Sequence, residues 1–165
     1  MQGLADIAGN YDAVLSDVWG VLHNGVVAHA SACDALVKFR AGGGRVVLIT
    51  NAPRPAADVI RILDRLAVSR EVYDDVVSSG DITRTMLSEY RGRTLHYVGP
   101  PHENDALFDG LDITIGPAEE ADAVVVTDLD TDDDTPDMYN DRKTGWLRRN
   151  LPLIAANPDR VVEHG

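Results

Sequence analysis

The amino-acid sequence predicts an α/β fold of the doubly wound, parallel-sheet (Rossmann-like) type. Two short and mostly apolar runs, residues 11–17 and 45–51, have the length of buried strands, and each is followed by a segment with apolar residues at helical spacing. The connections between these segments are short. Strands that alternate with helices over short connections are typical of parallel sheets with helices on their faces.

The first strand and helix are expected within residues 11–44. The strand (YDAVLSD, 11–17) is largely apolar up to the aspartate that ends it. The helix (SACDALVKFRAGGG, 31–44) has Ser31 as a candidate N-cap, Leu36 and Phe39 on one face, and three glycines that end it.

The second strand and helix are expected over residues 45–51 and 54–68. The strand (RVVLITN) is nearly all apolar, which predicts a central parallel strand covered on both faces. In the helix, Pro55 suits the first turn, and Val59 and Leu63 belong to an apolar stripe.

A second α/β block follows, and we place the boundary near Val77–Ser79, which divides the chain into residues 1–77 and 78–165. Its last helix is expected to begin at Thr135 and Pro136, with Trp146 and Leu147 on the apolar side. The block is expected to contain helices over 80–90, 103–108 and 135–150, strands over 93–99, 112–116 and 121–128, and a final strand and turn over 151–159.

Composition limits the classes of partner. The chain has 165 residues and a formal net charge of −12, which disfavours nucleic acid and anionic membrane surfaces as partners because both attract clustered Lys and Arg. Cys33 is the single cysteine, so an intrachain disulfide is excluded. We see no signal peptide and no apolar segment of membrane-spanning length, and we expect a cytoplasmic protein.

Polar residues end both strands of the first block. Asp17 ends one strand and Thr50 the other, and ligands of parallel sheets bind at the carboxyl ends of strands. Gly20 permits a tight turn after the aspartate, and Thr50 with Asn51 offers a hydroxyl and an amide to a phosphate oxygen. Asp17 itself has three candidate roles: a cap for the next turn, a metal ligand, or a nucleophile that attacks phosphorus.

Four separated segments resemble the haloacid dehalogenase-like hydrolases, in particular their class IIA branch of sugar-phosphate and nucleotide phosphatases. The segments are DVWGVLHNG, VVLITNAPRP, VVSSGDITR and PLIAANPDRVVEHG. The resemblance implies a Rossmann-like core into which an α/β cap domain is inserted. Residues 1–77 would then be the N-terminal part of the core, and residues 78–165 the cap and the start of the return to an incomplete core.

The resemblance also implies roles for the site residues. Asp17 would be the nucleophile that forms an aspartyl-phosphate and a ligand of Mg²⁺, and the backbone carbonyl of Trp19 would be a second ligand. Thr50 would hold the phosphoryl group with help from Asn51, beside the turn at Gly20. The implied cofactor is Mg²⁺, and the implied substrate is a small phosphorylated metabolite.

Two departures from the family pattern qualify these roles. The family usually has a second aspartate, the general acid and base, where this chain has Trp19, so the indole either packs over the turn or forms an aromatic wall facing the substrate. The family's Lys and acidic motifs follow the cap, but the chain's two lysines are Lys38 and Lys143, and neither matches.

We therefore expect this chain to be inactive by itself. The alternative is a non-catalytic ligand-binding or regulatory module on the same fold. Half of a doubly wound sheet leaves an exposed edge, so association with another copy through the incomplete core is also expected.

Overall fold

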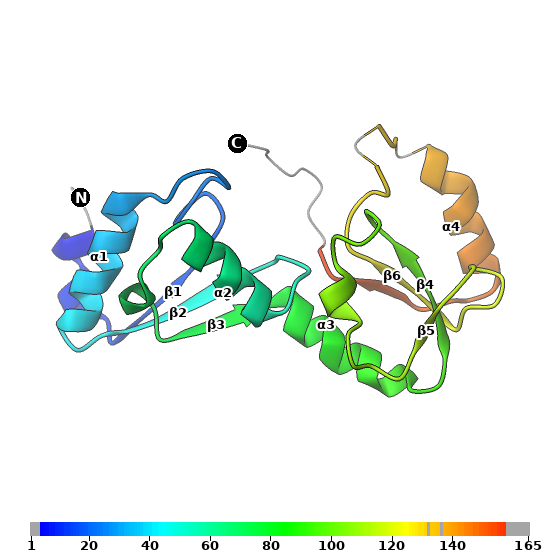
Figure 1. Cartoon of the computed structure of the whole chain (residues 1–165), viewed down its shortest axis with the longest axis horizontal. Coiled ribbons are helices and arrows are strands. Elements are labelled where there is room, and N and C mark those ends of the chain that lie inside the picture. Colours follow the sequence, from blue (N-terminus) through cyan, green and yellow to red (C-terminus); the bar gives the residue numbers. More distant parts are fainter. Residues whose placement is uncertain (1–3, 132, 136, 158–165) are drawn as a thin grey trace. The chain divides into compact units, whose positions relative to one another are not determined.

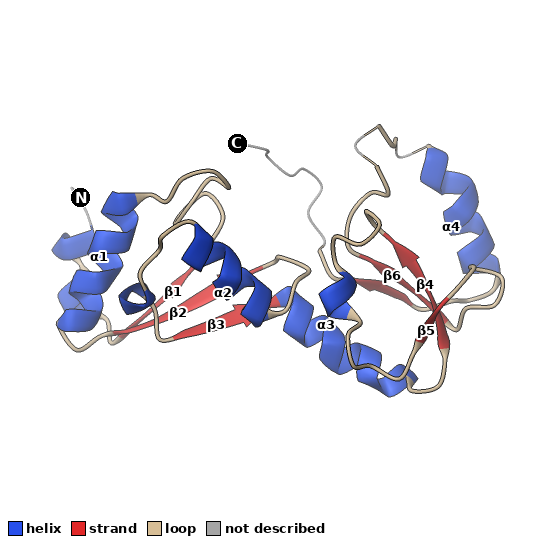
Figure 2. Cartoon of the chain, in the orientation of Figure 1, coloured by secondary structure: helices blue, strands red, loops and turns tan. Residues whose placement is uncertain are grey.

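The computed structural model describes residues 4–131, 133–135 and 137–157. Among these, residues 4–50 and 56–78 form one compact unit, and residues 51–55 and 79–157 form a second. Each unit contains its own parallel sheet (Figures 1 and 2). The fold is thus α/β with parallel, Rossmann-like sheets, as the sequence predicts.

The first unit contains a three-stranded parallel sheet in the order β1-β2-β3. Its strands are β1 (Ala13–Ser16), β2 (Arg45–Thr50) and β3 (Asp75–Ser78). Helix α1 (Ala30–Ala41) connects β1 to β2, and α2 (Ala56–Arg65) lies between β2 and β3 in the sequence. Short 3-10 turns occupy Leu4–Asp6, Ala8–Asn10 and Arg70–Val72.

Strand β2 is central, but only one of its faces is well covered. Val46, Leu48 and Thr50 are buried, whereas the alternate side chain of Ile49 is 43% exposed. Successive side chains of a strand point to opposite faces. The helices therefore cover the face that carries Val46 and Leu48, and the expectation that both faces of this strand are covered is wrong.

Strand β3 was not expected from the sequence, which predicts only a domain boundary at this point. It spans four residues and is followed directly by α3 (Ser79–Leu87), with no connecting loop. Such a short strand has too few residues for a clear alternation of apolar and polar positions. Its register with β2, which pairs Leu48 with Val76 and Thr50 with Ser78, depends on contacts distant in the sequence.

Two helix boundaries in the first unit differ from those predicted. Helix α1 begins at Ala30 with His29 as its N-cap, so Ser31 lies inside the helix. The backbone of His29 is extended, and its carbonyl already accepts the amides of Ala32 and Cys33. Helix α2 ends at Arg65 because Ala67 has a positive φ of 59°.

The second unit contains a four-stranded parallel sheet in the order β5-β4-β6-β7. Its strands are β4 (Thr94–Val98), β5 (Thr114–Ile115), β6 (Ala123–Val126) and β7 (Leu153–Ala155). Apolar clusters pack on both faces of the central strands, one around Leu95 and Leu107 and one around Val124 and Trp146. The sheet core thus lies at β4 and β6.

Helix α4 (Met138–Arg148) covers one face of this sheet. Trp146 is buried as predicted, but Leu147 is 67% exposed and does not belong to the apolar side. Residues 103–108 form only a 3-10 turn at Asp105–Leu107, and a second such turn, Ser88–Tyr90, extends α3. Pro136 and residues 158–165 lie outside the described residues. None of the described helices has the length and hydropathy needed to span a bilayer.

Candidate active site

Asp17 and Thr50 lie at the carboxyl ends of neighbouring parallel strands. Strand β1 ends at Ser16, whose register partner on β2 is Leu48, and Thr50 is the last residue of β2. Asp17 follows β1 directly. The sheet therefore brings the carboxylate and the hydroxyl to one edge, where parallel sheets bind their ligands.

The backbone around Asp17 is fixed, while its side chain is exposed. The carboxylate accepts a hydrogen bond of 2.7 Å from the Val18 amide, and the Ser16 hydroxyl donates to the Asp17 carbonyl at 2.9 Å. Ser16 and Val18 are both buried, and Asp17 is exposed between them. A carboxylate held in this way is accessible both to a metal ion and to a phosphorus atom.

The structure adds one residue, Ser78, that sequence analysis did not assign to the site. Thr50 is buried, and its register partner on β3 is Ser78, which is fully buried. Ser78 thus ends a third strand at the same edge of the sheet. The sequence offers one hint of this residue, the pair Val76-Val77 directly before it. That pair points to a strand end only once β3 is known. Asn51 is exposed and belongs to the second unit.

A tight loop after Asp17 positions Trp19. The Leu22 amide donates to the Val18 carbonyl and the Gly20 amide donates to the His23 carbonyl, both at 2.8 Å. Gly20 has a φ of +76°, which glycine adopts without steric cost. The loop buries Leu22 and His23 but leaves Trp19 44% exposed.

The orientation of the Trp19 indole is set by His23 and Gly25. The indole of Trp19 and the imidazole of His23 meet edge to face, with ring centroids 5.3 Å apart. A Cβ atom on Gly25 would lie 2.6 Å from the indole, so the ring rests directly on the glycine backbone. Trp19 therefore packs against its own loop, as one of the two sequence interpretations predicts, and still presents part of the indole to solvent.

His23 is a buried, neutral support for this loop. Its Nδ1 accepts a hydrogen bond of 2.9 Å from the Gly25 amide, which leaves the proton of the neutral ring on Nε2. Burial lowers the pKa of His23, and the nearby charge of His29 lowers it further. The ring accordingly stays uncharged at neutral pH and keeps its contact with Trp19.

The donors present fit Mg²⁺ only as a site shared with substrate. In the described part of the chain, no group of three His, Cys, Asp or Glu side chains is arranged to hold a metal ion. Mg²⁺ is, however, often held by one or two carboxylates together with substrate phosphates and water. The exposed Asp17 carboxylate would supply one such ligand, with the Trp19 carbonyl predicted as a second.

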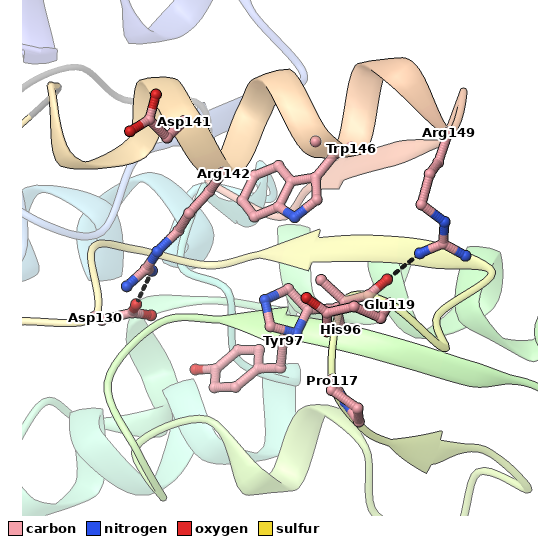
Figure 3. Close-up of a pocket in the computed structure, with 11 residues that line it drawn as sticks. His96, Tyr97, Pro117, Glu119, Asp130, Asp141, Arg142, Trp146 and Arg149 are labelled. Carbon is pink, nitrogen blue, oxygen red and sulfur yellow. Dashed lines mark hydrogen bonds and ion pairs between the residues drawn. The ribbon is translucent and has the colours of Figure 1, made fainter.

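The second unit holds a separate cavity of about 620 Å³ between β4, helix α4 and the loop after β5 (Figure 3). His96 and Tyr97 lie on β4, and Trp146 lies on α4 with its ring centroid 5.9 Å from that of His96. The Nδ1 atom of His96 lies 3.1 Å from the Gly116 carbonyl, to which it donates. The strand thereby holds the loop at one wall of the cavity.

The charged groups of this cavity are largely engaged by the protein. Arg142 forms an ion pair with Asp130, and Arg149 donates to the carbonyls of Ala118 and Ala121. Glu119 and Asp141 add two carboxylates to the lining. The charges of the cavity are thus of both signs, and both guanidinium groups already have partners within the protein.

Comparison with known proteins relates the chain to one group. Residues 14–112 match a family model described as haloacid dehalogenase-like hydrolase. A hydrolase of the haloacid dehalogenase-like family from Brucella suis 1330 is 42% identical, with a TM-score of 0.92, over 100% of this chain and 63% of its own. No protein with a curated description matches the chain.

Two more distant structures share the fold. NagD from E. coli K-12 is 25% identical, with a TM-score of 0.62, over 93% of this chain and 59% of its own. A glycerol phosphate phosphatase from Mycobacterium tuberculosis, solved in complex with magnesium, is 23% identical, with a TM-score of 0.64, over 94% of this chain and 47% of its own. The chain therefore spans less than two thirds of the length of these relatives.

Proposed function

Since this chain belongs to the haloacid dehalogenase-like hydrolase family, we propose that it carries the nucleophilic half of a phosphatase site. The observation that carries the proposal is the exposed Asp17 carboxylate at the end of β1, at the same sheet edge as Thr50. The glycerol phosphate phosphatase among the structural relatives supports phosphate ester hydrolysis as the reaction class. The proposed substrate is a small phosphorylated metabolite.

In the proposed reaction, a carboxylate oxygen of Asp17 attacks the phosphorus atom. The bond between phosphorus and the leaving oxygen breaks, and Asp17 becomes an aspartyl-phosphate while the leaving group takes a proton from solvent. Water then attacks the phosphorus, which releases inorganic phosphate and restores the carboxylate. Thr50 donates a hydrogen bond to an oxygen of the transferring group.

Mg²⁺, when bound, would neutralise charge between Asp17 and the phosphate. The chain's own residues orient the reacting groups: the Val18 amide holds the Asp17 carboxylate, and Gly20 permits the tight loop that follows it. Asn51 is proposed to assist Thr50. We expect turnover by the chain alone to be very low, because Trp19 cannot transfer protons at neutral pH and neither lysine of the sequence matches the family motif.

The test is the intact mass of the protein after incubation with acetyl phosphate, a phosphoryl donor with a good leaving group, with and without Mg²⁺. We expect one phosphoryl adduct on the chain. Asp17→Asn should reduce its formation on the order of 10⁴-fold or more, because the attacking oxygen is lost. The matched control is Asp12→Asn, at an exposed carboxylate before the same strand, which should leave the adduct and the melting temperature unchanged.

A non-catalytic module is the alternative, and Trp19 in place of a carboxylate is the observation that favours it. Such a module would bind phosphate esters without forming an adduct. An adduct that persists in Asp17→Asn would contradict the proposed nucleophile, and ligand binding with no adduct in the wild-type chain would establish the alternative.

A further inference from the structure

The dipeptide Asn24-Gly25 lies in the loop that carries Trp19. Asn24 is the one asparagine of the sequence that is followed by glycine. The backbone nitrogen of the next residue can attack an asparagine side chain and close a succinimide ring. A glycine in that next position leaves the approach unhindered, because it has no Cβ atom. Whether the reaction is fast or slow depends on the groups that the fold places around the pair.

A short hairpin holds both residues in place. His23 and Ala28 pair across it, and the Asn24 amide donates to the Val27 carbonyl at 3.2 Å. Gly25 is exposed and has a φ of 91°, and Asn24 is half-buried. A positive φ at the first central position is typical of a two-residue hairpin turn. The Gly25 nitrogen is therefore fixed by the turn, and water has access to the pair.

Two backbone amides polarise the side-chain carbonyl of Asn24. Its Oδ1 accepts a hydrogen bond of 3.0 Å from the Val26 amide and one of 2.9 Å from the Val27 amide. When a nucleophile adds to the side-chain carbon, negative charge develops on this oxygen. Fixed donors at such an oxygen act as an oxyanion hole. The turn therefore favours attack on the side-chain carbon of Asn24.

A proton acceptor already contacts the attacking nitrogen. The Gly25 amide donates to Nδ1 of His23 at 2.9 Å. His23 is buried, and its ring meets the indole of Trp19 edge to face, so the acceptor is held in position. A positioned imidazole that takes a proton from an attacking group is a general base. The nucleophile, the base and the oxyanion donors thus all come from residues 23–27.

We propose that Asn24-Gly25 is a self-modification site, whose own loop catalyses the conversion of Asn24 to aspartate and isoaspartate. The Gly25 nitrogen bonds to the side-chain carbon of Asn24 while His23 takes the amide proton. The bond from that carbon to Nδ2 then breaks, and Nδ2 leaves as ammonia with this proton. Water opens the succinimide at either carbonyl, which gives the two products. Water is the one co-reactant, and the inference does not depend on the proposed phosphatase activity.

Conversion to isoaspartate would remove the support of Trp19. In isoaspartate the main chain runs through the side chain of residue 24, so it gains a methylene group before Gly25. The hydrogen bond from Gly25 to His23 and the contact of the indole with the Gly25 backbone both depend on the unmodified chain length. The modification would therefore change the loop that follows Asp17 as the protein ages.

The experiment follows the conversion of Asn24 in the purified chain at neutral pH, by peptide mapping with mass spectrometry. The reference is a synthetic peptide of residues 19–29 in the same buffer, in which the turn is not held. We expect Asn24 to convert roughly tenfold faster or more in the folded chain, because the oxyanion donors and the base are already in position. Asn51, which is followed by Ala52, is the internal control and should stay unchanged. Conversion no faster than in the peptide would overturn the inference.

A pair of histidine variants tests the base. His23→Phe keeps a ring beside Trp19 but removes Nδ1, so it should slow the conversion roughly tenfold or more, toward the rate of the peptide. The matched control is His29→Phe in the same loop, which should convert at the wild-type rate because the Gly25 amide donates to His23. Equal rates in the two variants would overturn the assignment of His23 as the base. If the melting curve shows that His23→Phe does not fold, the comparison with the peptide still decides the inference.

The emission of Trp19 reports on the consequence for the loop. In a Trp146→Phe background, the emission should shift in step with the conversion of Asn24, since the indole loses its contact with Gly25. Emission that stays constant while Asn24 converts would contradict the loss of this support.

Discussion

At the scale of single residues, the candidate site is defined by two neighbours of Asp17, Thr50 and Trp19. Sequence reasoning places Asp17 and Thr50 at strand ends, and the parallel register brings those ends to one edge. It leaves the role of Trp19 open, because its packing depends on a loop that turns back on itself. The contact of the indole with the Gly25 backbone joins residues six apart through space, and no local pattern encodes it.

Trp19 leads to a prediction about the lifetime of the aspartyl-phosphate. An indole cannot accept a proton from attacking water, so a phosphorylated Asp17 is expected to hydrolyse slowly. Trp19→Asp should shorten the lifetime of the adduct by about 10²–10⁴-fold, because it supplies a general base. Mass spectrometry after removal of acetyl phosphate measures the decay. Trp19→Asn is the control, and equal decay in both variants would show that proton transfer is not the missing function.

The support under Trp19 can be tested with two glycines of the same loop. Gly25 and Gly20 both have positive φ, 91° and 76°, so alanine at either costs about 1–2 kcal/mol of folding free energy. Only at Gly25 would the new Cβ also meet the indole. Gly25→Ala should therefore destabilise more than Gly20→Ala and shift the emission of Trp19, measured in a Trp146→Phe background. Identical melting temperatures and spectra would show that the indole does not rest on Gly25.

At the scale of helices and strands, prediction succeeded for segments whose own residue pattern indicates a helix or a strand. Strands β2 and β6 are continuous apolar runs, and the glycines after α1 end that helix as expected. Strand β3 was missed because its four residues form a strand only through their neighbours, whereas the predicted strand over 112–116 contains the two residues of β5. The exposure of Ile49 on β2 was missed for a related reason: an apolar run does not reveal which of its faces is covered.

The join between β3 and α3 gives a prediction at this scale. Gly80 lies in the first turn of α3, and a Cβ there would lie 2.2 Å from the backbone of Arg54. Gly80→Ala should cost about 1–3 kcal/mol or more, because backbone atoms cannot move aside easily. The matched helix position is Gly145 in α4, where nothing lies within 4 Å and alanine should stabilise by about 1 kcal/mol. Urea unfolding of the two variants measures both changes, and destabilisation by both would contradict the steric account.

At the scale of the whole molecule, the chain consists of two units with separate sheets and separate cores. The described chain passes between the units after Thr50, after Pro55 and after Ser78. Sequence analysis recognises two α/β blocks, but it cannot assign residues 51–55 to the second unit. That assignment depends on contacts with segments distant in the sequence, such as the hydrogen bond from the Gly80 amide to the Ala52 carbonyl.

Separate cores predict separate responses to mutation. Leu48 on β2 and Leu95 on β4 are both fully buried, one in each unit. Leu48→Ala and Leu95→Ala should each lower the free energy of unfolding by about 2–5 kcal/mol. The loss should fall chiefly on the unit whose core loses the leucine side chain. Hydrogen exchange followed by mass spectrometry should show faster exchange in β1 and β2 for the first variant, and in β4 and β6 for the second. Uniform acceleration across both sheets by either variant would show that the units unfold together.

The order of the strands in the first sheet affects how the protein is made. Strands β1, β2 and β3 lie side by side in the order in which they occur in the sequence, and the last of them ends at Ser78. All the partners of β1 within this sheet therefore leave the ribosome before α3 does. Contacts between such near segments form early. The first sheet is expected to assemble during translation, and the growing chain would then display its uncovered aliphatic face to chaperones while the second unit is still being synthesised.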